Sequence, residues 1–424
     1  MSGDLADVVV VGCGVQGLSI ALNVARRGQR VIAVDRVGPG LQTSARAAGQ
    51  SVIAQTDPAM GALMHRSIAG IVDFTAQTGI PLPYHQVGSI KYACHQWSAH
   101  QLEREVARAT SLGARVDMID LADAGKLAPH TNPSAAVAAW HAPDDIYFEP
   151  PQLVAALYQA AVAAGVDFRF GVSVTGIAVA AGRVSGIYST AGLFACDAIV
   201  VAAGSWTATL LQNALGVSLP LTFVRHQYSI RTGVPQINPS LPSVRVVDHA
   251  VYARPVGTDL MFGTYEPHPL TFDSTVLPAR AEDVPLDPDP INDALNHVAQ
   301  LFPRVAGSAV AEMRGGLVTM TPDGSYIIDQ CDAATGLYFL AGCNVMGLSV
   351  APALGEDVAE WVTTGHRPDS LAGFAASRFD TPQRSTAELE HRGLGEYEAI
   401  YRDAQSREHV RSYGGGYRDR RADN

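Results

Sequence analysis

Three glycines close to the N-terminus have the spacing of a site for dinucleotide phosphates. Gly12, Gly14 and Gly17 form a Gly-x-Gly-x-x-Gly pattern. In such a pattern the first glycine allows a tight turn, the second lets the backbone approach a pyrophosphate, and the third lets a helix pack closely on a strand. Asp35 follows roughly 20 residues later, where a carboxylate can accept a hydrogen bond from a ribose hydroxyl. These residues indicate dinucleotide binding, although the glycines alone could form an ordinary glycine-rich turn.

The segments around the glycines have the hydrophobic pattern that such a site needs. Residues 7–11 form an apolar run of strand length, and apolar residues at helical spacing follow the glycines. Gly28 stands where a helix would end, and residues 30–34 have the character of a second buried strand. The order strand, turn, helix, strand predicts two parallel neighbouring strands and favours dinucleotide binding over an ordinary turn. The apolar helical positions are Leu18, Ala21, Leu22 and Ala25.

Composition bounds the class of protein. The chain has 424 residues, of which 47% are hydrophobic and 17% charged, which is enough for a large buried core of one or two domains. A net charge of -11 argues against nucleic acid or an anionic membrane as the main partner. The five cysteines have no metal-like spacing, and no apolar run or N-terminal pattern indicates a membrane span or signal peptide. We therefore expect a cytoplasmic α/β protein with reduced thiols and no metal.

Along the rest of the chain, segments typical of a nucleotide-binding domain alternate with segments that have an α+β pattern. A polar loop with Thr43 and Ser44 follows the second strand, where it would face a bound cofactor unless it is only an exposed connection. A helix is expected over residues 57–78, an α+β region with a strand pair over residues 135–150, and then a return to the nucleotide domain up to Gly204. Residues 219–266 alternate like an antiparallel sheet beside a pocket.

Several motifs resemble the D-amino-acid oxidase-like superfamily of flavoenzymes, in particular its dimethylglycine, sarcosine and glycine oxidase branch. They are the N-terminal unit already described, AIVVAAGSW in mid-chain, RHQY at 225–228, VYARP at 251–255, FGTYE at 262–266, and AGCNVMGLS near residue 345. The resemblance covers about residues 5–400 and implies a Rossmann-like FAD-binding domain interleaved with an α+β substrate domain that contains an antiparallel sheet. It divides the chain into FAD segments 5–86, 150–218 and 313–366, substrate segments 87–149 and 219–312, and a C-terminal extension 367–424.

The resemblance also assigns residues to roles. His226 and Tyr252 would be the catalytic pair, on neighbouring strands of the substrate sheet, although a His or a Tyr in a strand can equally be a packed structural residue. The substrate would contact Arg254, Arg46 and Met346. The cofactor would be held by Gly12, Gly14, Val15, Gln16, Gly17, Asp35, Arg36, Thr43, Ser44, Arg46, Ala48, Gly49, Val174, Ala203, Gly204, Gly342, Met346, Gly347, Leu348 and Ser349.

Departures from the family pattern refine these expectations. The position of the flavin-tethering His of dimethylglycine-type enzymes is Arg46 here, and that of the tethering Cys of monomeric sarcosine oxidases is Gly316, so FAD should be noncovalent. Val318 and Ser349 replace the usual carboxylate-binding Arg and Lys. Met261 replaces the Lys that favours reaction with oxygen, so the electron acceptor is either O2 or a protein.

The implied reaction is oxidation of a small secondary or tertiary amine, such as an N-substituted glycine. Hydride transfer to flavin N5 would give an imine, which water hydrolyses to an amine plus glyoxylate or formaldehyde. Two alternatives stay open: oxidation of a 2-hydroxy acid on the same fold, and a role as the flavin subunit of a hetero-oligomeric dehydrogenase.

Overall fold

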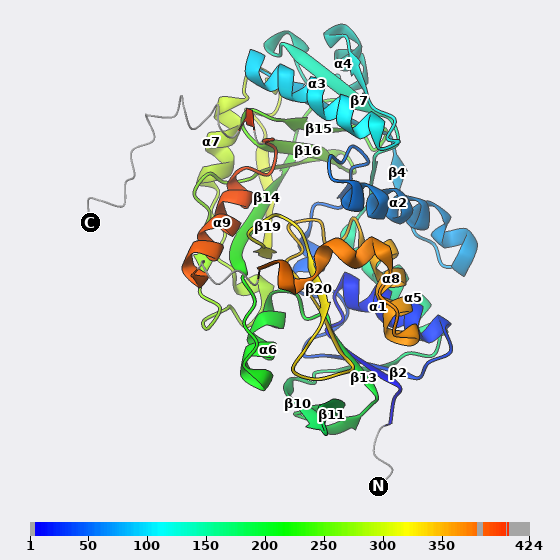
Figure 1. The fold of residues 1–424 in the computed structure, drawn as a ribbon. Helices are drawn as coiled ribbons and strands as arrows, with labels where there is room; N and C mark the ends of the chain where they lie inside the picture. The colour runs from blue at the N-terminus through cyan, green and yellow to red at the C-terminus, as the bar shows by residue number, and fades with distance from the viewer. Residues whose placement is uncertain (1–4, 380–384, 404, 407–424) are drawn as a thin grey trace.

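The computed structural model describes residues 5–379, 385–403 and 405–406, and Figure 1 shows their arrangement. Most of the polar end of the expected C-terminal extension, residues 407–424, lies outside the described residues.

The N-terminal glycine turn follows β1, an interior strand of a six-stranded sheet with the order β20-β21-β13-β1-β2-β9. The four strands β13, β1, β2 and β9 run parallel, and β21 is parallel to β13, while β20 is antiparallel to β21. The expected parallel pair is therefore confirmed. The bounds are β1 Val8–Val11, β2 Val31–Asp35, β9 Asp167–Phe170, β13 Ala198–Val201, β20 Ile327–Gln330 and β21 Leu337–Ala341.

The residues of β1 alternate between the two faces of this sheet, and each face is covered. Val8 and Val10 belong to a core that includes residues of three helices, whereas Val9 and Val11 belong to a second core with a small three-stranded sheet. The helices are α1 Val15–Arg26, α5 Pro150–Ala163 and α8 Ala351–Thr364, and the small sheet consists of β10 Val174–Ala180, β11 Arg183–Ser189 and β12 Gly192–Ala195. Figure 1 shows these elements together in the lower half of the molecule.

A second, larger sheet occupies the upper half of Figure 1. Its order is β18-β14-β17-β16-β15-β5-β7-β6, with β19 paired to β14, and it is antiparallel except for β15 and β5. Helix α3 Gln96–Ser111 packs on β5 and β7. The strand bounds are β5 Ser89–Ala93, β6 Asp117–Ile119, β7 Ala138–Ala142, β14 Thr222–Thr232, β15 Ser243–Val246, β16 Val251–Val256, β17 Asp259–Thr264, β18 Thr271–Phe272 and β19 Ala309–Met320.

The remaining elements connect or cover the two sheets. Helix α2 Pro58–Thr78 begins after Asp57, whose side chain accepts a hydrogen bond from the backbone of Met60, so the expected helix over residues 57–78 is confirmed. The others are β3 Gln50–Ser51, β4 His85–Gln86, β8 Ile146–Tyr147, α4 Leu121–Leu127, α6 Thr207–Leu215, α7 Asp289–His297 and α9 Thr386–Glu398.

The observed strand pairing bears on two sequence expectations, the strand pair and the domain division. The strand pair expected over residues 135–150 is wrong, because β7 joins the large sheet while β8 pairs with β3 and β4. The domain division stays a prediction. It cuts the chain at residue 313, whereas β19 pairs with β14 along the whole of Ala309–Met320. The chain passes between the halves of the molecule at this strand.

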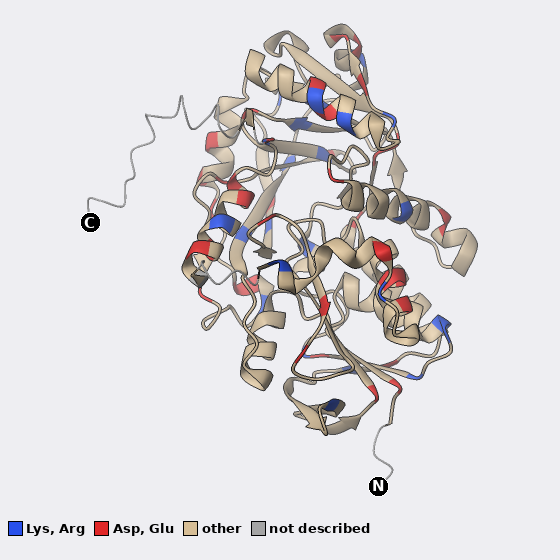
Figure 2. Ribbon diagram, in the orientation of Figure 1, with Lys and Arg blue, Asp and Glu red and all other residues tan. Residues whose placement is uncertain are grey.

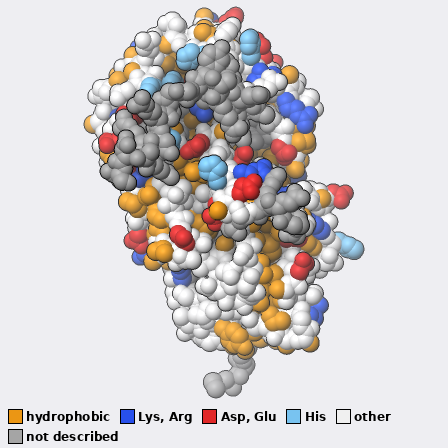
Figure 3. Space-filling model, turned by 60° about the vertical axis from the view of Figure 1, so that its left-hand side comes forward, with side chains coloured by type: hydrophobic (Ala, Val, Ile, Leu, Met, Phe, Trp, Pro, Cys, Tyr) orange, Lys and Arg blue, Asp and Glu red, His pale blue; other side chains and the backbone are white. Residues whose placement is uncertain are grey.

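Charges of both signs are scattered along the elements of both halves (Figure 2). On the face shown in Figure 3, acidic and basic side chains also lie singly or in small mixed groups. Among the described residues no helix is long and apolar enough to cross a membrane. All five cysteines are free thiols.

Candidate functional site: a nucleotide cavity beside a His–Tyr pair

A cavity of about 280 Å³ lies at the glycine turn between β1 and α1. Its walls come from loops at the carboxyl ends of β1, β2 and β13 and from β19. The carboxyl ends of parallel strands are the usual place for a ligand in such a sheet. Of the residues expected to hold the cofactor, the cavity is lined by Gly12, Gly14, Val15, Gln16, Asp35, Arg36, Thr43, Ser44, Val174, Ala203, Gly204, Gly347 and Leu348.

The three glycines of the turn play different parts. Gly12 has φ +101°, and a Cβ atom there would lie 2.5 Å from the carbonyl oxygen of Ala202. A Cβ atom on Gly17 would lie 1.9 Å from the carbonyl oxygen of Gly12, so this position fixes the contact of helix and turn. At Gly14 a Cβ atom would meet only Ser44 Oγ, at 3.3 Å. Gly14 is thus the glycine that keeps space open at the cavity wall.

Asp35 joins the glycine turn to the loop that follows β2. Its Oδ2 accepts a hydrogen bond from the backbone N–H of Cys13 at 2.8 Å. Its Oδ1 accepts from the N–H groups of Val37 at 2.7 Å and Gly38 at 3.0 Å. A carboxylate oxygen can accept two hydrogen bonds, so Oδ2 retains one lone pair for a ligand hydroxyl.

Two side chains in the cavity wall carry buried donors without a partner in the described protein. These are Nη2 of Arg36 and Nε2 of Gln42. The Arg36 guanidinium lies 4.1 Å from the centre of the Trp206 ring, and burial lowers its pKa. A buried donor left unpaired is costly, so these groups fit an anionic, oxygen-rich ligand such as a dinucleotide. Together with the open cradle at Gly14, they match the group that the glycine turn implies.

The remaining residues expected at the cofactor do not line the cavity. Gly17 lies in the first turn of α1, and the others lie in the connecting segments beside the cavity. Gly49 has φ +66° and its Cβ position is 2.2 Å from the carbonyl oxygen of Phe148, while the Ser349 hydroxyl donates to the carbonyl of Gln50 at 2.7 Å. Their contact with a cofactor stays a prediction. The residues in question are Gly17, Arg46, Ala48, Gly49, Gly342, Met346 and Ser349.

Several lining residues were not among those expected at the cofactor. Most lie within a few residues of expected ones in the chain, Leu210 lies on α6, and three lie on β19, whose approach to the cavity no local pattern indicates. They are Val11, Val34, Gln42, Ala47, Val172, Ser173, Ala202, Ser205, Trp206, Leu210, Leu317, Val318, Thr319, Cys343 and Val345.

The structure brings His226 and Tyr252 together. The Tyr252 hydroxyl lies 2.9 Å from Nε2 of His226. Neither residue lines the cavity, but Gly316, the partner of His226 on β19, packs against Thr43 in the cavity wall. Their contact with a substrate stays a prediction. The expectation that they lie on neighbouring strands is wrong, because β17 separates β14 from β16.

Gly263 on β17 explains how Tyr252 spans the intervening strand. A Cβ atom at this position would lie 2.3 Å from Cζ and 2.4 Å from the hydroxyl oxygen of Tyr252. The missing side chain leaves the space through which the tyrosine ring crosses β17 to reach His226. A glycine inside an alternating strand is a known signal for such a close approach.

Burial keeps the His226 ring neutral. It lowers the pKa of His226 to about 4, and no charged group is among the causes. The imidazole therefore accepts and donates hydrogen bonds at neutral pH but does not carry a charge.

This pKa predicts an acid-dependent loss of stability. Because the folded state binds a proton on His226 only near pH 4 and an unfolded histidine does so near pH 6.5, the unfolding free energy should fall as the pH drops through this window. Between pH 7 and pH 5 we expect wild type to lose on the order of 2 kcal/mol more than His226→Gln. Chemical denaturation at both pH values measures this. Burial also lowers the pKa of His130 to about 4. His130 is present in both proteins, so its contribution to the change in unfolding free energy cancels in the comparison. Equal losses would contradict the assigned pKa.

Arg254 and Arg46 have protein partners. Arg254 is fully buried, with Nε donating to the Ala48 carbonyl at 2.6 Å and Nη1 to Glu149 at 2.8 Å. It ties the large sheet to the loop that carries Thr43 and Ser44. Arg46 approaches Glu282 at 3.4 Å on the surface. Neither arginine lines the cavity, so their role in substrate binding stays a prediction.

Two known proteins are similar in sequence to most of this chain. The 4-methylaminobutanoate oxidase (formaldehyde-forming) of Paenarthrobacter nicotinovorans is 25% identical over 405 residues, which are 93% of this chain and 48% of the relative. The mitochondrial pyruvate dehydrogenase phosphatase regulatory subunit of Mus musculus is 26% identical over 400 residues, or 93% of this chain and 46% of the relative. The chain thus spans about half the length of these two relatives.

A solved structure and a family model complete the comparison. The crystal structure of glycine oxidase from Geobacillus kaustophilus superposes with a TM-score of 0.77 and 25% identity, covering 89% of this chain and all (100%) of that one. The model of the family described as FAD dependent oxidoreductase matches residues 7–361, which include the glycine turn, both members of the His–Tyr pair and the loop before α8. The chain belongs to this family of FAD-dependent oxidoreductases.

Proposed function

We propose that this flavoenzyme oxidises a secondary or tertiary amine, of the N-substituted glycine type, at a carbon next to nitrogen. The observation that carries the proposal is the neutral His226 paired with Tyr252 beside the FAD cavity. Named relatives support the substrate class, since they include an oxidase of a methylamino acid and a glycine oxidase.

FAD, when bound, supplies the acceptor for the hydride that leaves the carbon next to nitrogen. The residues that would hold it are Gly12 and Gly14 of the glycine turn, Asp35, Arg36, and the loop residues Thr43 and Ser44, all of which line the cavity. A neutral secondary amine that loses a hydride and its N–H proton becomes an imine, and a tertiary amine that loses a hydride becomes an iminium ion. Water converts the imine to an amine and an aldehyde, and it converts the iminium ion to the same kinds of product with release of a proton. Oxidation of an N-methyl carbon releases formaldehyde, and oxidation of the glycine carbon releases glyoxylate.

The His226–Tyr252 pair would orient the amine. The Tyr252 hydroxyl, held by the neutral His226, can hydrogen-bond an amine without adding a charge that repels an ammonium group. Hydride leaves a carbon only when the nitrogen lone pair is free, so a site that favours the neutral amine assists the reaction. Val318 in the cavity wall and Ser349, whose hydroxyl donates to Gln50, stand where the usual carboxylate-binding Arg and Lys are expected, so these two clamps are missing.

Product analysis tests the proposal. Incubation with N-methyl and N-carboxymethyl amines and an artificial dye acceptor should release formaldehyde or glyoxylate in a one-to-one ratio with dye reduced. Release of a 2-oxo acid from a 2-hydroxy acid, with no aldehyde from any amine, would show that the alternative substrate class is correct.

A second candidate is favoured by one comparison. A relative of similar identity is named as the regulatory subunit of a phosphatase. This chain would then carry FAD as a subunit of a larger assembly. Dye reduction by amines with the purified chain alone separates the two candidates, because a subunit without its own oxidation site should show none.

We predict that the flavin is bound without a covalent link. Neither position of a family tether holds a His or a Cys, since these residues are Arg46 and Gly316. Cys343 in the cavity wall has its Sγ 3.8 Å from the Thr319 hydroxyl. Acid precipitation should leave intact FAD in the supernatant. Yellow colour in the washed pellet would contradict the prediction.

A substitution at Gly263 should separate the His–Tyr pair without touching either residue. In Gly263→Ala the new methyl group overlaps the Tyr252 ring, so the hydroxyl must move away from His226. We expect amine-dependent flavin reduction to slow on the order of tenfold with FAD still bound. The control is Gly373→Ala, where a Cβ atom meets nothing within 4 Å. An unchanged rate in Gly263→Ala would show that the contact is not needed.

A further inference from the structure

The C-terminal segment brings two tyrosines to the His–Tyr pair. Tyr397 lies at the end of α9, is fully buried, and has its hydroxyl 2.8 Å from Nδ1 of His226. Tyr401 follows one turn later. Its ring centre is 5.2 Å from that of Tyr265, which stacks on His226 at 4.7 Å. Side chains from a segment outside both sheets therefore enclose the imidazole.

The two nitrogens of His226 are both occupied by phenol groups. A neutral imidazole has one N–H donor and one acceptor nitrogen. The Tyr397 hydroxyl also lies 3.4 Å from the carbonyl oxygen of Arg225, which can only accept. If the Tyr397 hydrogen points to this carbonyl, its oxygen accepts from Nδ1–H, and Nε2 then accepts from the Tyr252 hydroxyl. This assignment satisfies all three contacts and leaves the Tyr252 oxygen free to accept from an amine N–H.

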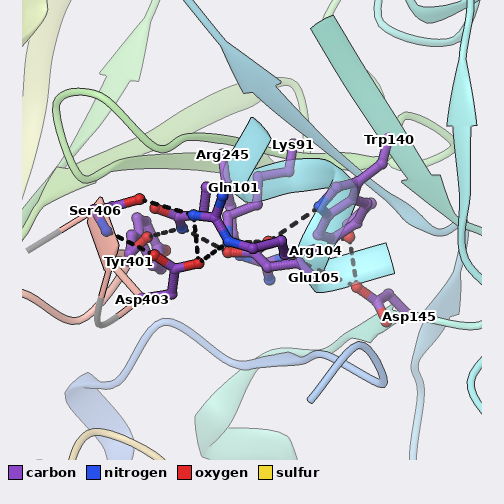
Figure 4. A network of polar contacts seen from close by, with 11 residues as sticks. Lys91, Gln101, Arg104, Glu105, Trp140, Asp145, Arg245, Tyr401, Asp403 and Ser406 are labelled. Atoms are coloured by element: carbon purple, nitrogen blue, oxygen red, sulfur yellow. Dashed lines mark hydrogen bonds and ion pairs between the residues drawn. The ribbon is translucent and has the colours of Figure 1, made fainter. Parts of the chain in front are cut away.

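A polar network fixes the C-terminal segment on the large sheet and its helix α3 (Figure 4). Arg104 on α3 binds Asp403 at 2.7 Å and Ser406 at 3.4 Å. Gln101, also on α3, donates to the Tyr401 carbonyl. Lys91, whose ammonium pairs with Glu105 at 2.8 Å, lies 5.2 Å from the centre of the Tyr401 ring.

The apolar surroundings of Tyr397 connect this segment with the cavity. Tyr397 packs with Val224, Val318 and Met320, and Val345 lies against the same cluster. Val318 and Val345 also line the FAD cavity. Through Tyr397, α9 therefore contacts both the His–Tyr pair and residues of the cavity wall.

We propose that Tyr397 is a positioning residue that fixes the tautomer and orientation of His226, so that the C-terminal segment completes the site. The inference rests on the proposed function for its effect on rate, but the hydrogen-bonding state of His226 does not depend on the substrate. The two can therefore be tested separately.

The first test is ¹⁵N NMR of protein labelled at histidine, with His226→Ala to identify the signals. Wild type at pH 7 should show one neutral tautomer with the proton on Nδ1. Tyr397→Phe should shift the population toward the other tautomer. The matched control is Tyr92→Phe, which removes a buried hydroxyl that bonds Thr131 away from the site. An unchanged His226 signal in Tyr397→Phe overturns the proposal whether or not any amine is oxidised.

The second test is a double-mutant cycle on flavin reduction. Tyr397→Phe should slow single-turnover reduction on the order of tenfold in wild type and less than about twofold in His226→Ala, because its effect passes through His226. Tyr92→Phe should leave the rate unchanged. An equal slowing in both backgrounds would mean that Tyr397 acts on its own or only on stability. If no compound reduces the flavin, the proposed function fails and the NMR result still decides the role of Tyr397.

Discussion

Gly14→Val should give a folded protein that binds no FAD. Gly14 has extended backbone angles, φ −67° and ψ 176°, which valine adopts without strain. A Cβ atom there meets only Ser44 Oγ at 3.3 Å, so the branched side chain extends into the cavity and not into the core. It would occupy the space in which a pyrophosphate approaches the turn. The purified variant should be colourless, with a far-UV circular dichroism spectrum like that of wild type.

The control for this variant is Gly307→Val. A Cβ atom at Gly307 meets nothing within 4 Å, and the residue does not line the cavity. This protein should remain yellow with a full complement of FAD. A fully loaded Gly14→Val protein would show that the dinucleotide lies elsewhere.

His226→Ala and Tyr252→Phe should both slow flavin reduction by an amine on the order of ten- to a thousand-fold, the range for a positioning or acid–base group. Both should keep FAD, because neither residue lines the cavity. Tyr252→Phe removes the hydroxyl that bonds His226 at 2.9 Å and little else. Anaerobic stopped-flow mixing, with the bleaching of the flavin absorbance as the signal, gives the rate of this step directly.

A purely structural role for the pair makes a different prediction. Loss of one buried hydrogen bond lowers the unfolding free energy by about 1 kcal/mol and leaves the rate of the folded protein unchanged. Tyr92→Phe supplies the reference for such a loss, since its hydroxyl bonds Thr131 at 3.0 Å in the same sheet. Normal reduction rates in both site variants, with only a lowered melting temperature, would refute the active-site assignment.

Local features of the sequence were sufficient for the nucleotide half. The spacing of Gly12, Gly14 and Gly17 indicates local steric requirements. The structure shows close backbone contacts at Gly12 and Gly17 and open space at Gly14. The helix after Asp57 is likewise set by its own cap and periodicity. Such elements can be predicted because the contacts that determine them are near in sequence.

The His–Tyr pair depends on contacts between distant residues, and here the sequence was less informative. His226 and Tyr397 are 171 positions apart, and no periodicity links α9 to β14. The family resemblance pointed to His226 and Tyr252, but not to the strand between them. Gly263 carried a readable signal, since a glycine inside a strand favours a close approach. The partners of β7 and β8 likewise follow from the assembled sheets and not from the alternation within each strand.

Met261 shows that a difference from a family pattern can be interpreted only once the surroundings of the residue in the fold are known. It stands where a lysine assists reaction with oxygen in related oxidases, but here the side chain is fully buried with Tyr228, Ile230 and Tyr252. A lysine introduced at this position would place an unpaired charge in an apolar cluster, which costs several kcal/mol or forces the amine to deprotonate. The electron acceptor is therefore better tested by direct reoxidation of wild type.

The most direct measurement is anaerobic titration of the bound FAD with a panel of N-methyl amines, N-carboxymethyl amines and 2-hydroxy acids. The account predicts that at least one secondary or tertiary amine bleaches the flavin fully, with one aldehyde formed per FAD reduced, and that the 2-hydroxy acids leave it oxidised. Bleaching by a 2-hydroxy acid alone, or an oxidised flavin with every compound in the panel, would contradict the proposal that this protein oxidises amines.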